Sequence, residues 1–326
     1  MAINLSLVKE PLVSIIITYY NLWKYIHDCV FSILNQEYKN FEIIIVNDNS
    51  DEKNFKILKK ISAKNLKIIN LEKNKGQLGA FLEGLKIAQG EFICTVDADD
   101  ILLPDYLKTL LYVHLNNNVA FVSSSGGEIN QKNELTSLNS KNNQINKQAD
   151  RIFYRQIQNL YNQNESFEIN FLDIKSLPFA QGGWNPSSSA MIRKEALEIL
   201  KYYSDVNFWK TGADKVIFSL LHLIGGSANI SAVCYLYRHH DSNNFKTTLS
   251  TGNKKYLCED YVKKIILWNK KIRLDSIKMF IKNKNSLIEK YNKINYLKML
   301  YRIIFCINLK TCAKIIKTFA HEIINI

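Results

Sequence analysis

The chain has 326 residues, of which 47% are hydrophobic, and a formal net charge of +13. This length and composition predict an ordinary globular protein with a large core and one or two domains. The charge is unevenly placed, because residues 246–326 contain 18 Lys or Arg but only 5 Asp or Glu. We therefore expect an accessory basic surface with its own partner, which argues against a generally basic protein.

The six cysteines are scattered, and none forms a Cys-x-x-Cys pair. This pattern argues against a disulfide framework or a zinc site and favours a reduced, cytoplasmic compartment. Residues 1–10 show no signal peptide pattern. No stretch reaches the roughly 18 uncharged apolar residues of a membrane span.

Apolar, β-branched runs alternate with segments of helical periodicity in the first part of the chain. The strands expected here are Leu12–Thr18, Phe41–Val46, Leu66–Leu71, Phe92–Val96 and Val119–Ser123. The helices expected between them are Leu22–Asn35, Lys53–Ile61 and Gln77–Ala88, and Pro104 is placed to begin a fourth. Strands that alternate with helices at this spacing predict a parallel, doubly wound α/β sheet.

The pattern is less regular in the second part of the chain. Residues 123–146 are rich in polar residues and predict a long loop, and an apolar stripe over 152–161 predicts a helix. The elements expected next are a strand at Ser187–Ile192, helices at Lys194–Tyr203 and Ala213–Leu223, and a strand at Ile230–Tyr237. Residues 254–326 predict an almost wholly helical C-terminal extension.

The most informative stretch is residues 91–100, where an apolar run ends in three acidic residues. Side chains alternate along a strand, so Asp97 and Asp99 point the same way, about 6–7 Å apart. Carboxylates at the C-terminal tip of such a strand lie where open α/β sheets bind ligands. They could hold a hard divalent cation that shares phosphate oxygens with a substrate. The alternative is an acidic turn that caps the next helix.

Several segments, taken in this order and spacing, resemble the family 2 glycosyltransferases. They are Pro11–Asn21 (PLVSIIITYYN), Ile45–Ser50 (IVNDNS), Asn74–Gly76 (NKG), Gly90–Ile93 (GEFI) and Asp97–Asp100 (DADD) followed by Pro104. The resemblance is strong from Pro11 to Tyr106 and weaker to Asn244. It implies a GT-A fold: a Rossmann-like, mostly parallel sheet that binds a nucleotide-sugar. On this basis residues 1–122 are expected to form the nucleotide-sugar half and 123–245 the acceptor half, before a basic helical region at 246–326.

The resemblance assigns the nucleotide to residues beyond the first three strands. Asp48 would accept a hydrogen bond from uracil, with capping of the next helix as the alternative role. Thr18 and Tyr19 would lie near the nucleotide. Asn74 and Gly76 would shape a loop over the base and ribose, although Gly76 is equally explained as a turn glycine.

The resemblance also implies a metal and diphosphate site. Asp97 would face the ribose and the metal, and Asp99 would bind Mn²⁺ or Mg²⁺, which stabilises charge on the leaving diphosphate. The segment Tyr237–Asn243 (YRHHDSN) resembles the family's Tyr-Arg-x-His-x-x-Asn pattern. It makes His240 a third metal ligand and brings Arg238 to the diphosphate, with a purely structural histidine as the alternative.

An inverting transfer needs a base for the acceptor hydroxyl. The segment Thr211–Leu220 matches the family's helix for this base and places Asp214 at the catalytic position, with Asp205 as the fallback. Ala213 replaces the usual Glu, and Asp214 could instead be a first-turn acid favoured by the helix dipole. Trp184 would stack on the acceptor sugar or pack in the core.

A second departure from the family lies in the helix after Gly76, where an Arg-Asn pair is usual. Phe81 and Leu82 stand in those places, so the donor preference cannot be carried over from the family.

The end of the chain is a basic amphipathic segment, with Lys310, Lys314, Lys317 and His321 on one stripe. Such a helix suits an anionic membrane surface, which we expect to be contacted through residues 296–326. The alternative is a helix packed on the domain or on a second copy in a homo-oligomer. Nucleic acid is not expected as a partner, because no aromatic residues are interleaved on the basic face.

The function expected from the resemblance is transfer of a sugar from a nucleotide-sugar, most simply a UDP-sugar, to a glycan or lipid-linked glycan. A surface polysaccharide pathway follows by analogy alone. The alternative is a non-catalytic scaffold with the same fold. A dinucleotide-dependent oxidoreductase is rejected, because Gly-x-Gly-x-x-Gly does not follow the first strand.

Overall fold

The computed structural model describes residues 10–138, 167–172, 184–241, 243, 248–251, 254–257 and 259–305. The strands in these ranges are β1 (Val13–Tyr19), β2 (Phe41–Asn47), β3 (Leu66–Asn70), β4 (Phe92–Asp97), β5 (Ile101–Leu102), β6 (Phe121–Ile129), β7 (Leu135–Leu138), β8 (Ile169–Phe171), β9 (Ala190–Arg193), β10 (Ser227–Arg238), β11 (Thr248–Thr251) and β12 (Lys254–Leu257). The α-helices are α1 (Ile26–Leu34), α2 (Glu52–Leu58), α3 (Gly76–Ile87), α4 (Tyr106–Asn116), α6 (Ala213–Gly225), α7 (Glu259–Lys282), α8 (Lys284–Tyr291) and α9 (Lys293–Phe305). Short 3₁₀ helices are η3 (Ser187–Ser189), η4 (Lys194–Tyr202) and η5 (Val206–Phe208).

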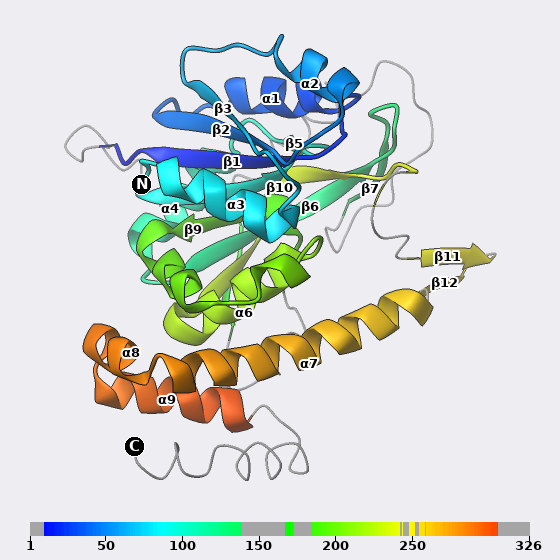
Figure 1. Cartoon of the computed structure of the whole chain (residues 1–326). Helices are drawn as coiled ribbons and strands as arrows, with labels where there is room; N and C mark the ends of the chain where they lie inside the picture. The colour runs from blue at the N-terminus through cyan, green and yellow to red at the C-terminus, as the bar shows by residue number, and fades with distance from the viewer. Residues whose placement is uncertain are drawn as a thin grey trace.

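The centre of the molecule is one sheet with the strand order β3-β2-β1-β4-β9-β6-β10-β5 (Figure 1). The neighbouring pairs β3–β2, β2–β1 and β1–β4 are parallel, and β10 is parallel to β6. Only β9, between β4 and β6, and the short β5 run antiparallel to their neighbours along this order. The mostly parallel α/β sheet expected from the sequence is therefore confirmed.

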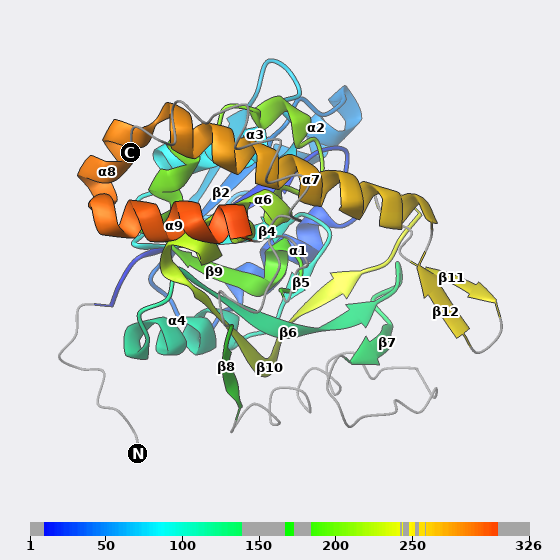
Figure 2. The same cartoon turned by 90° about the horizontal axis from the view of Figure 1, so that it is seen from below.

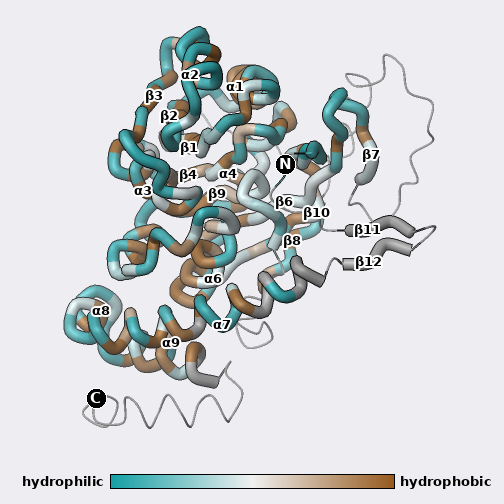
Figure 3. Tube along the Cα trace, turned by 45° about the vertical axis from the view of Figure 1, so that its right-hand side comes forward, coloured by the Kyte–Doolittle hydropathy of each residue, from teal (hydrophilic) through white to brown (hydrophobic). Residues whose placement is uncertain are grey.

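Alternation along the strands builds a core on each face of the sheet. In β1, Ile16 packs with α3, η4 and α6 on one face, whereas Ile15 and Ile17 pack with α1 and α4 on the other. Both faces of the central strands are therefore apolar, as expected for a parallel sheet covered by helices on both sides. Figure 3 shows this hydrophobic character through the central strands and α6.

The helices α7, α8 and α9 form a further layer on the side of α6 away from the sheet (Figure 1). Seen from below, α7 and α9 lie side by side (Figure 2). Buried Trp268, Ile272 and Phe280 of α7 and Tyr296 of α9 belong to the same hydrophobic cluster as α6. The helical C-terminal extension is confirmed, and it packs on α6.

Four segments differ from their expected form. The loop expected from residue 123 is largely strand up to residue 138, because β6 continues to Ile129 and β7 pairs back onto it. The helix expected at Lys194–Tyr203 is a 3₁₀ helix, η4, and the expected strand Ser187–Ile192 begins as the 3₁₀ helix η3 before β9. Residues 254–257, expected to be helical, form β12 and pair with β11. In this pairing the backbone N–H and C=O groups of each strand find hydrogen-bond partners in the other. The helix expected around 152–161 lies outside the described residues.

The expected boundary at residue 122 falls inside β6, which crosses it within the continuous sheet. The division into two halves and a tail remains a prediction. Within the described residues, no helix is both long and apolar enough to cross a membrane.

Candidate active site

The polar ends of β1, β2 and β4 meet at one edge of the sheet. Thr18 lies opposite Asp97 in the pairing of β1 with β4, and Tyr19 lies opposite Asn47 in the pairing of β1 with β2. Asp48 follows Asn47 directly. The carboxyl ends of these three parallel strands therefore gather the residues that the sequence assigned to the nucleotide, as such sheets do at their ligand sites.

Asp48 is 4% exposed, and its carboxylate accepts hydrogen bonds from the backbone N–H groups of Lys75 (2.6 Å) and Gly76 (2.9 Å). Burial raises the pKa of Asp48 above its ordinary value, although these two amides act in the opposite direction. The alternative role as a helix cap does not hold, because Asp51 caps α2 by accepting a hydrogen bond from the Asn54 N–H. Asp48 instead fixes the loop at Asn74–Gly76, and its contact with a base remains a prediction.

The loop at Asn74–Gly76 is held from two sides. The Asn74 side chain donates to the Asp48 carbonyl over 3.1 Å. Gly76 has a φ of +75°, and a Cβ at this position would lie 2.7 Å from the Cα of Lys210. Gly76 is therefore required both by its left-handed backbone and by the close approach of a distant segment.

Tyr19 is buried, whereas the next residue, Tyr20, is exposed. Tyr19 is fully buried, and its hydroxyl donates to the Asn54 side-chain oxygen over 3.0 Å. Its side chain is therefore not available to contact a nucleotide. Tyr20 follows the end of β1 and is 51% exposed. It is an exposed aromatic residue next to the carboxyl end of β1 that the sequence reasoning did not single out.

The three acids beyond β4 are tied to η3 and β10. Ser188 donates its hydroxyl to Asp100 (2.6 Å) and accepts from the Asp97 N–H (3.0 Å). The backbone N–H of Arg238 also donates to the fully buried Asp100. Burial raises the pKa of Asp100 well above its ordinary value, and the charges of Asp99 and Asp97 add to the rise. Asp100 is thus a structural anchor of the turn.

Burial raises the pKa of Asp97 to about 7, and repulsion from the carboxylates of Asp99 and Asp214 acts in the same direction. The acid at the end of β4 and the acid at the start of α6 are thus electrostatic neighbours. Asp214 is 9% exposed, and its carboxylate lies 3.6 Å from the Lys215 ammonium. The predicted base therefore lies beside the predicted donor site.

Two of the three predicted metal ligands are in direct contact. His240 Nε2 and Asp99 Oδ2 are 2.8 Å apart, and the His240 ring stacks against Tyr25 with centroids 4.6 Å apart. Asp97 is instead bonded through Oδ1 to the Gln77 side chain. Across the described part of the chain, no three His, Cys, Asp or Glu side chains are arranged to hold a metal ion.

The Arg238 side chain is fully buried, and its guanidinium bonds to other groups of the protein. Its Nε donates to the Asp99 carbonyl (2.7 Å), one terminal nitrogen donates to the Asn133 side-chain oxygen, and the other lies 3.3 Å from Asp28 Oδ2. The guanidinium also lies over the Tyr25 ring, 4.9 Å from its centroid. Arg238 therefore joins α1, the β6–β7 turn and the Asp99 peptide, and contact with a diphosphate remains a prediction.

The remaining candidates lie in apolar or paired surroundings. Trp184 donates from Nε1 to the Ser227 hydroxyl (2.9 Å) and packs edge-on against Phe121, which supports the alternative of core packing. Asp205, the fallback base, forms an ion pair with Lys271 on α7. Phe81, at the position of the family's usual Arg, is buried in the core.

A family model described as "Glycosyl transferase family 2" matches residues 14–179. The chain belongs to this family. A Haemophilus influenzae glycosyltransferase of unknown specificity is 37% identical over 117 residues, which cover 35% of this chain and 36% of that protein. The glycosyltransferase GlyG of Streptococcus pneumoniae is 26% identical over 263 residues, which cover 78% of this chain and 80% of GlyG.

The WfgD protein of Escherichia coli, a UDP-Glc:α-D-GlcNAc-diphosphoundecaprenol β-1,3-glucosyltransferase, is 37% identical over 114 residues. The match covers 35% of this chain and 45% of WfgD. This chain thus spans between about a third and a half of several of its relatives. Among solved structures, residues 1–349 of S. aureus TarS in complex with UDP-GlcNAc superpose with a TM-score of 0.56 at 16% identity, covering 91% of this chain and 81% of TarS 1–349. The GT-A fold expected from the sequence is confirmed.

Sequence reasoning missed several polar residues that organise the site of this glycosyltransferase. Gln77 bonds to Asp97, Ser188 joins Asp97 to Asp100, and the Lys210 ammonium donates to the Asn74 carbonyl over 3.2 Å. Gln77 follows the Asn74–Gly76 motif directly, which was a usable signal. Ser188 and Lys210 lie in segments without a distinctive pattern, so only the fold reveals them.

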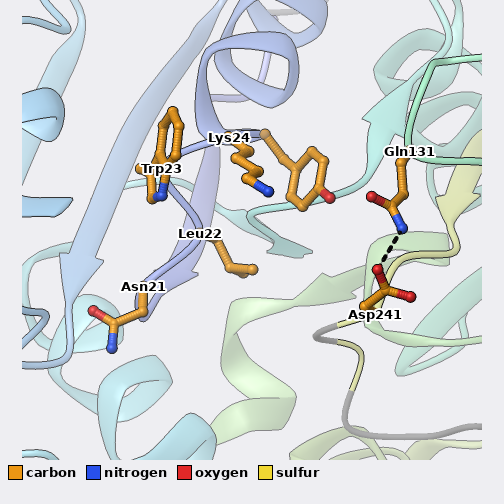
Figure 4. A pocket seen from close by; sticks show the side chains of 7 residues that line it. Asn21, Leu22, Trp23, Lys24, Gln131 and Asp241 are labelled. Carbon is orange, nitrogen blue, oxygen red and sulfur yellow. Dashed lines mark hydrogen bonds between the residues drawn. The ribbon is translucent and has the colours of Figure 1, made fainter.

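A small polar cavity of about 240 Å³ lies near the His240–Asp99 pair of the glycosyltransferase. Figure 4 shows Leu22 and Lys24 on one side and Gln131 and Asp241 on the other, with Gln131 donating to Asp241 over 3.1 Å. Tyr25 also lines this cavity and packs against the His240 ring. Tyr25 therefore connects the cavity to His240, which contacts Asp99.

Proposed function

We propose that this glycosyltransferase moves a sugar, with inversion, from a UDP-sugar to a glycan or lipid-linked glycan in bacterial surface polysaccharide synthesis. The observation that carries the proposal is that the Gln77 side chain hydrogen-bonds both to Asp97, at the tip of β4, and to the N–H of Ala213, which directly precedes Asp214 at the start of α6. It supports a donor-side acid close to a candidate base, as a direct displacement requires.

The donor would occupy the edge formed by β1, β2 and β4. Thr18 and Asp97 pair at this edge, Tyr19 pairs with Asn47, and Asp48 binds the loop at Gly76. The solved complex of TarS contains UDP-GlcNAc, and the name of WfgD gives UDP-Glc as its donor. Both support a uridine nucleotide here, and the sugar is a hexose or an N-acetylhexosamine.

The donor set suits a divalent metal ion. Asp99 and His240 already lie together, and buried acids beside them repel one another, so a bound cation would relieve this repulsion. Asp99 and His240, with Asp97 nearby, would hold Mn²⁺ or Mg²⁺. When bound, the ion supplies charge stabilisation for the departing nucleoside diphosphate.

Asp214 would act as the general base. Its carboxylate takes the proton from the acceptor hydroxyl as that oxygen bonds to the anomeric carbon, while the bond from this carbon to the diphosphate breaks. The nucleoside diphosphate leaves with the electron pair of that bond. Asp214 is nearly buried, so bulk water has little access to compete with the acceptor.

The acceptor would be a glycan or a lipid-linked glycan. The name of WfgD gives a diphosphoundecaprenol-linked acceptor, which supports a lipid-linked glycan. We also propose peripheral contact with an anionic membrane through residues 296–326. The described part of this segment supports it, because Leu297 and Tyr301 of α9 are 39% and 58% exposed beside the exposed Lys298. Lys310, Lys314, Lys317 and His321 lie outside the described residues.

The test is nucleotide release from UDP-, GDP- and dTDP-sugars supplied with diphosphoundecaprenol-linked N-acetylglucosamine and either Mn²⁺ or a chelator. We expect release from a UDP-sugar only, and we expect Asp214→Asn to lower kcat at least about 1,000-fold while UDP binding is retained, since general base catalysis contributes about 100- to 10,000-fold. Asp205→Asn is the matched control and should stay within about threefold of the wild type. Equal activity of Asp214→Asn and the wild type would refute the base assignment.

A further inference from the structure

Gln77 connects the two acids of the proposed mechanism. Its side-chain nitrogen Nε2 donates to Asp97 Oδ1 over 2.9 Å, and its side-chain oxygen Oε1 accepts from the Ala213 N–H over 3.0 Å. Ala213 is the first residue of α6 and directly precedes Asp214. One amide side chain therefore spans from the donor-side acid to the helix that carries the predicted base.

The bond to Ala213 meets a need of the helix. The first N–H groups of an α-helix have no partner within it, and a side chain normally caps them. Gly212 at the N-cap of α6 has no side chain, and its φ of +73° is left-handed. A bulkier residue is excluded there, because a Cβ would lie 2.5 Å from the Trp268 ring. Gln77 supplies the missing cap from α3.

The backbone around Gln77 is tied to the same segment. The Gln77 N–H donates to the Lys210 carbonyl (3.1 Å), and the Leu78 N–H donates to the Trp209 carbonyl (3.3 Å). Gly76 packs against the Lys210 backbone. Backbone hydrogen bonds therefore join the start of α3 to residues 209–210, just before α6. The Gln77 side chain extends from this junction to Asp97 and to Ala213.

Only an amide of this length can make both bonds. An ionised carboxylate accepts but does not donate, so Glu could cap α6 but would repel Asp97. A Met side chain has similar length and makes neither bond. Gln77→Glu therefore keeps the cap of α6 but loses the bond to Asp97, whereas Gln77→Met loses both.

We infer that Gln77 is a positioning residue that fixes the distance and orientation between Asp97 and the start of α6. This would hold Asp214 where it can take the proton of an acceptor hydroxyl that attacks the donor's anomeric carbon. The inference rests on the proposed function. Its effect should appear in turnover more than in nucleotide affinity, because Gln77 fixes the relation of the two sites and neither forms nor breaks a bond.

A control lies in Gln36, which is fully buried, whereas Gln77 is partly buried. Its Nε2 donates to the Leu103 carbonyl (2.7 Å), and its Oε1 accepts from the Leu107 N–H (3.0 Å) in the first turn of α4. Gln36 thus caps a helix from a distance as Gln77 does, but both of its partners are backbone groups. Gln36→Met therefore measures how much stability and turnover are lost when such a bridge is removed and neither partner is an acid.

The experiment measures kcat, donor KM and UDP affinity for Gln77→Met, Gln77→Glu and Gln36→Met, each corrected for the folded fraction. We expect Gln77→Met to lower kcat about 10- to 100-fold with UDP affinity changed less than about threefold, since small misplacements of reacting groups have effects of this size. Gln77→Glu should not restore the rate. Gln36→Met should lower the melting temperature and leave kcat within about threefold.

Two results would overturn the inference. One is a kcat of Gln77→Met no lower than that of Gln36→Met, and the other is wild-type turnover in Gln77→Glu, which would show that capping α6 is sufficient. Amide hydrogen exchange tests the bridge without any activity. Faster exchange at Ala213 in Gln77→Met than in the wild type supports it, and unchanged exchange refutes it even if no donor is ever turned over.

Discussion

Arg238 is the fully buried cation of the site, and its removal should destabilise the fold. Arg238→Met keeps most of the buried aliphatic volume but removes the bonds to the Asp99 carbonyl, the Asn133 side chain and Asp28. A net hydrogen bond from a charged group contributes about 1.5–3 kcal/mol. Part of this is recovered, because the Asp28 side chain is 42% exposed and can be rehydrated.

We therefore expect Arg238→Met to lower the free energy of unfolding by about 3–6 kcal/mol, the contribution of the two bonds to the Asp99 carbonyl and the Asn133 side chain, since hydration largely replaces the bond to Asp28. The control is Asp28→Asn, which removes the same ion pair from its exposed side. Its amide oxygen can still accept from Arg238, so the loss should be about 1 kcal/mol or less.

The assay is urea unfolding followed by circular dichroism at pH 7.5, with the m-value checked for each variant. The comparison requires a single cooperative transition in all three proteins. If Arg238→Met costs no more than Asp28→Asn, the buried guanidinium does not hold α1, the β6–β7 turn and the acidic turn together.

Two further predictions concern the backbone and the core. Gly76→Ala should cost about 2 kcal/mol or more, because its left-handed backbone and the Lys210 contact both oppose a Cβ. Gly226→Ala, with a φ of +69° and no atom within 4 Å of its Cβ, should cost only about 1–2 kcal/mol in the same unfolding assay, and a larger loss at Gly226 would contradict this reasoning. Burial lowers the pKa of His114 to about 4, so the unfolded chain binds its proton first as the pH falls. Stability should therefore fall from pH 6.5 to 4 by up to about 3 kcal/mol more in the wild type than in His114→Gln, and parallel pH profiles would refute it.

The sequence predicted the nucleotide half of the fold well, because its signal is local. β1, β2 and β4 are apolar runs within about one residue of their expected bounds, and their parallel order brings Thr18, Asp48 and Asp97 together. η4 was expected to be an α-helix, because the apolar spacing of a 3₁₀ helix and that of an α-helix differ little over nine residues.

The connections within the site were not predictable, because they join distant parts of the chain. Gln77 and Ala213 are 136 residues apart, and Asp28 and Arg238 are 210 residues apart. No periodicity relates such pairs, and their contact depends on how separate elements pack. Tyr19 shows the same limit, since its motif position was clear but its burial against Asn54 was not.

The proposed donor site is the edge formed by β1, β2 and β4, which would bind a nucleoside diphosphate with a divalent ion. We would test it first by calorimetric titration of UDP into the wild type and Asp99→Asn, with Mn²⁺ and with chelator. We expect UDP to bind to the wild type at least about tenfold more tightly with Mn²⁺ than with chelator, and Asp99→Asn to remove this difference, because Asp99 would hold the ion. Failure of UDP to bind under either condition, or an equal gain from Mn²⁺ in Asp99→Asn, would contradict it.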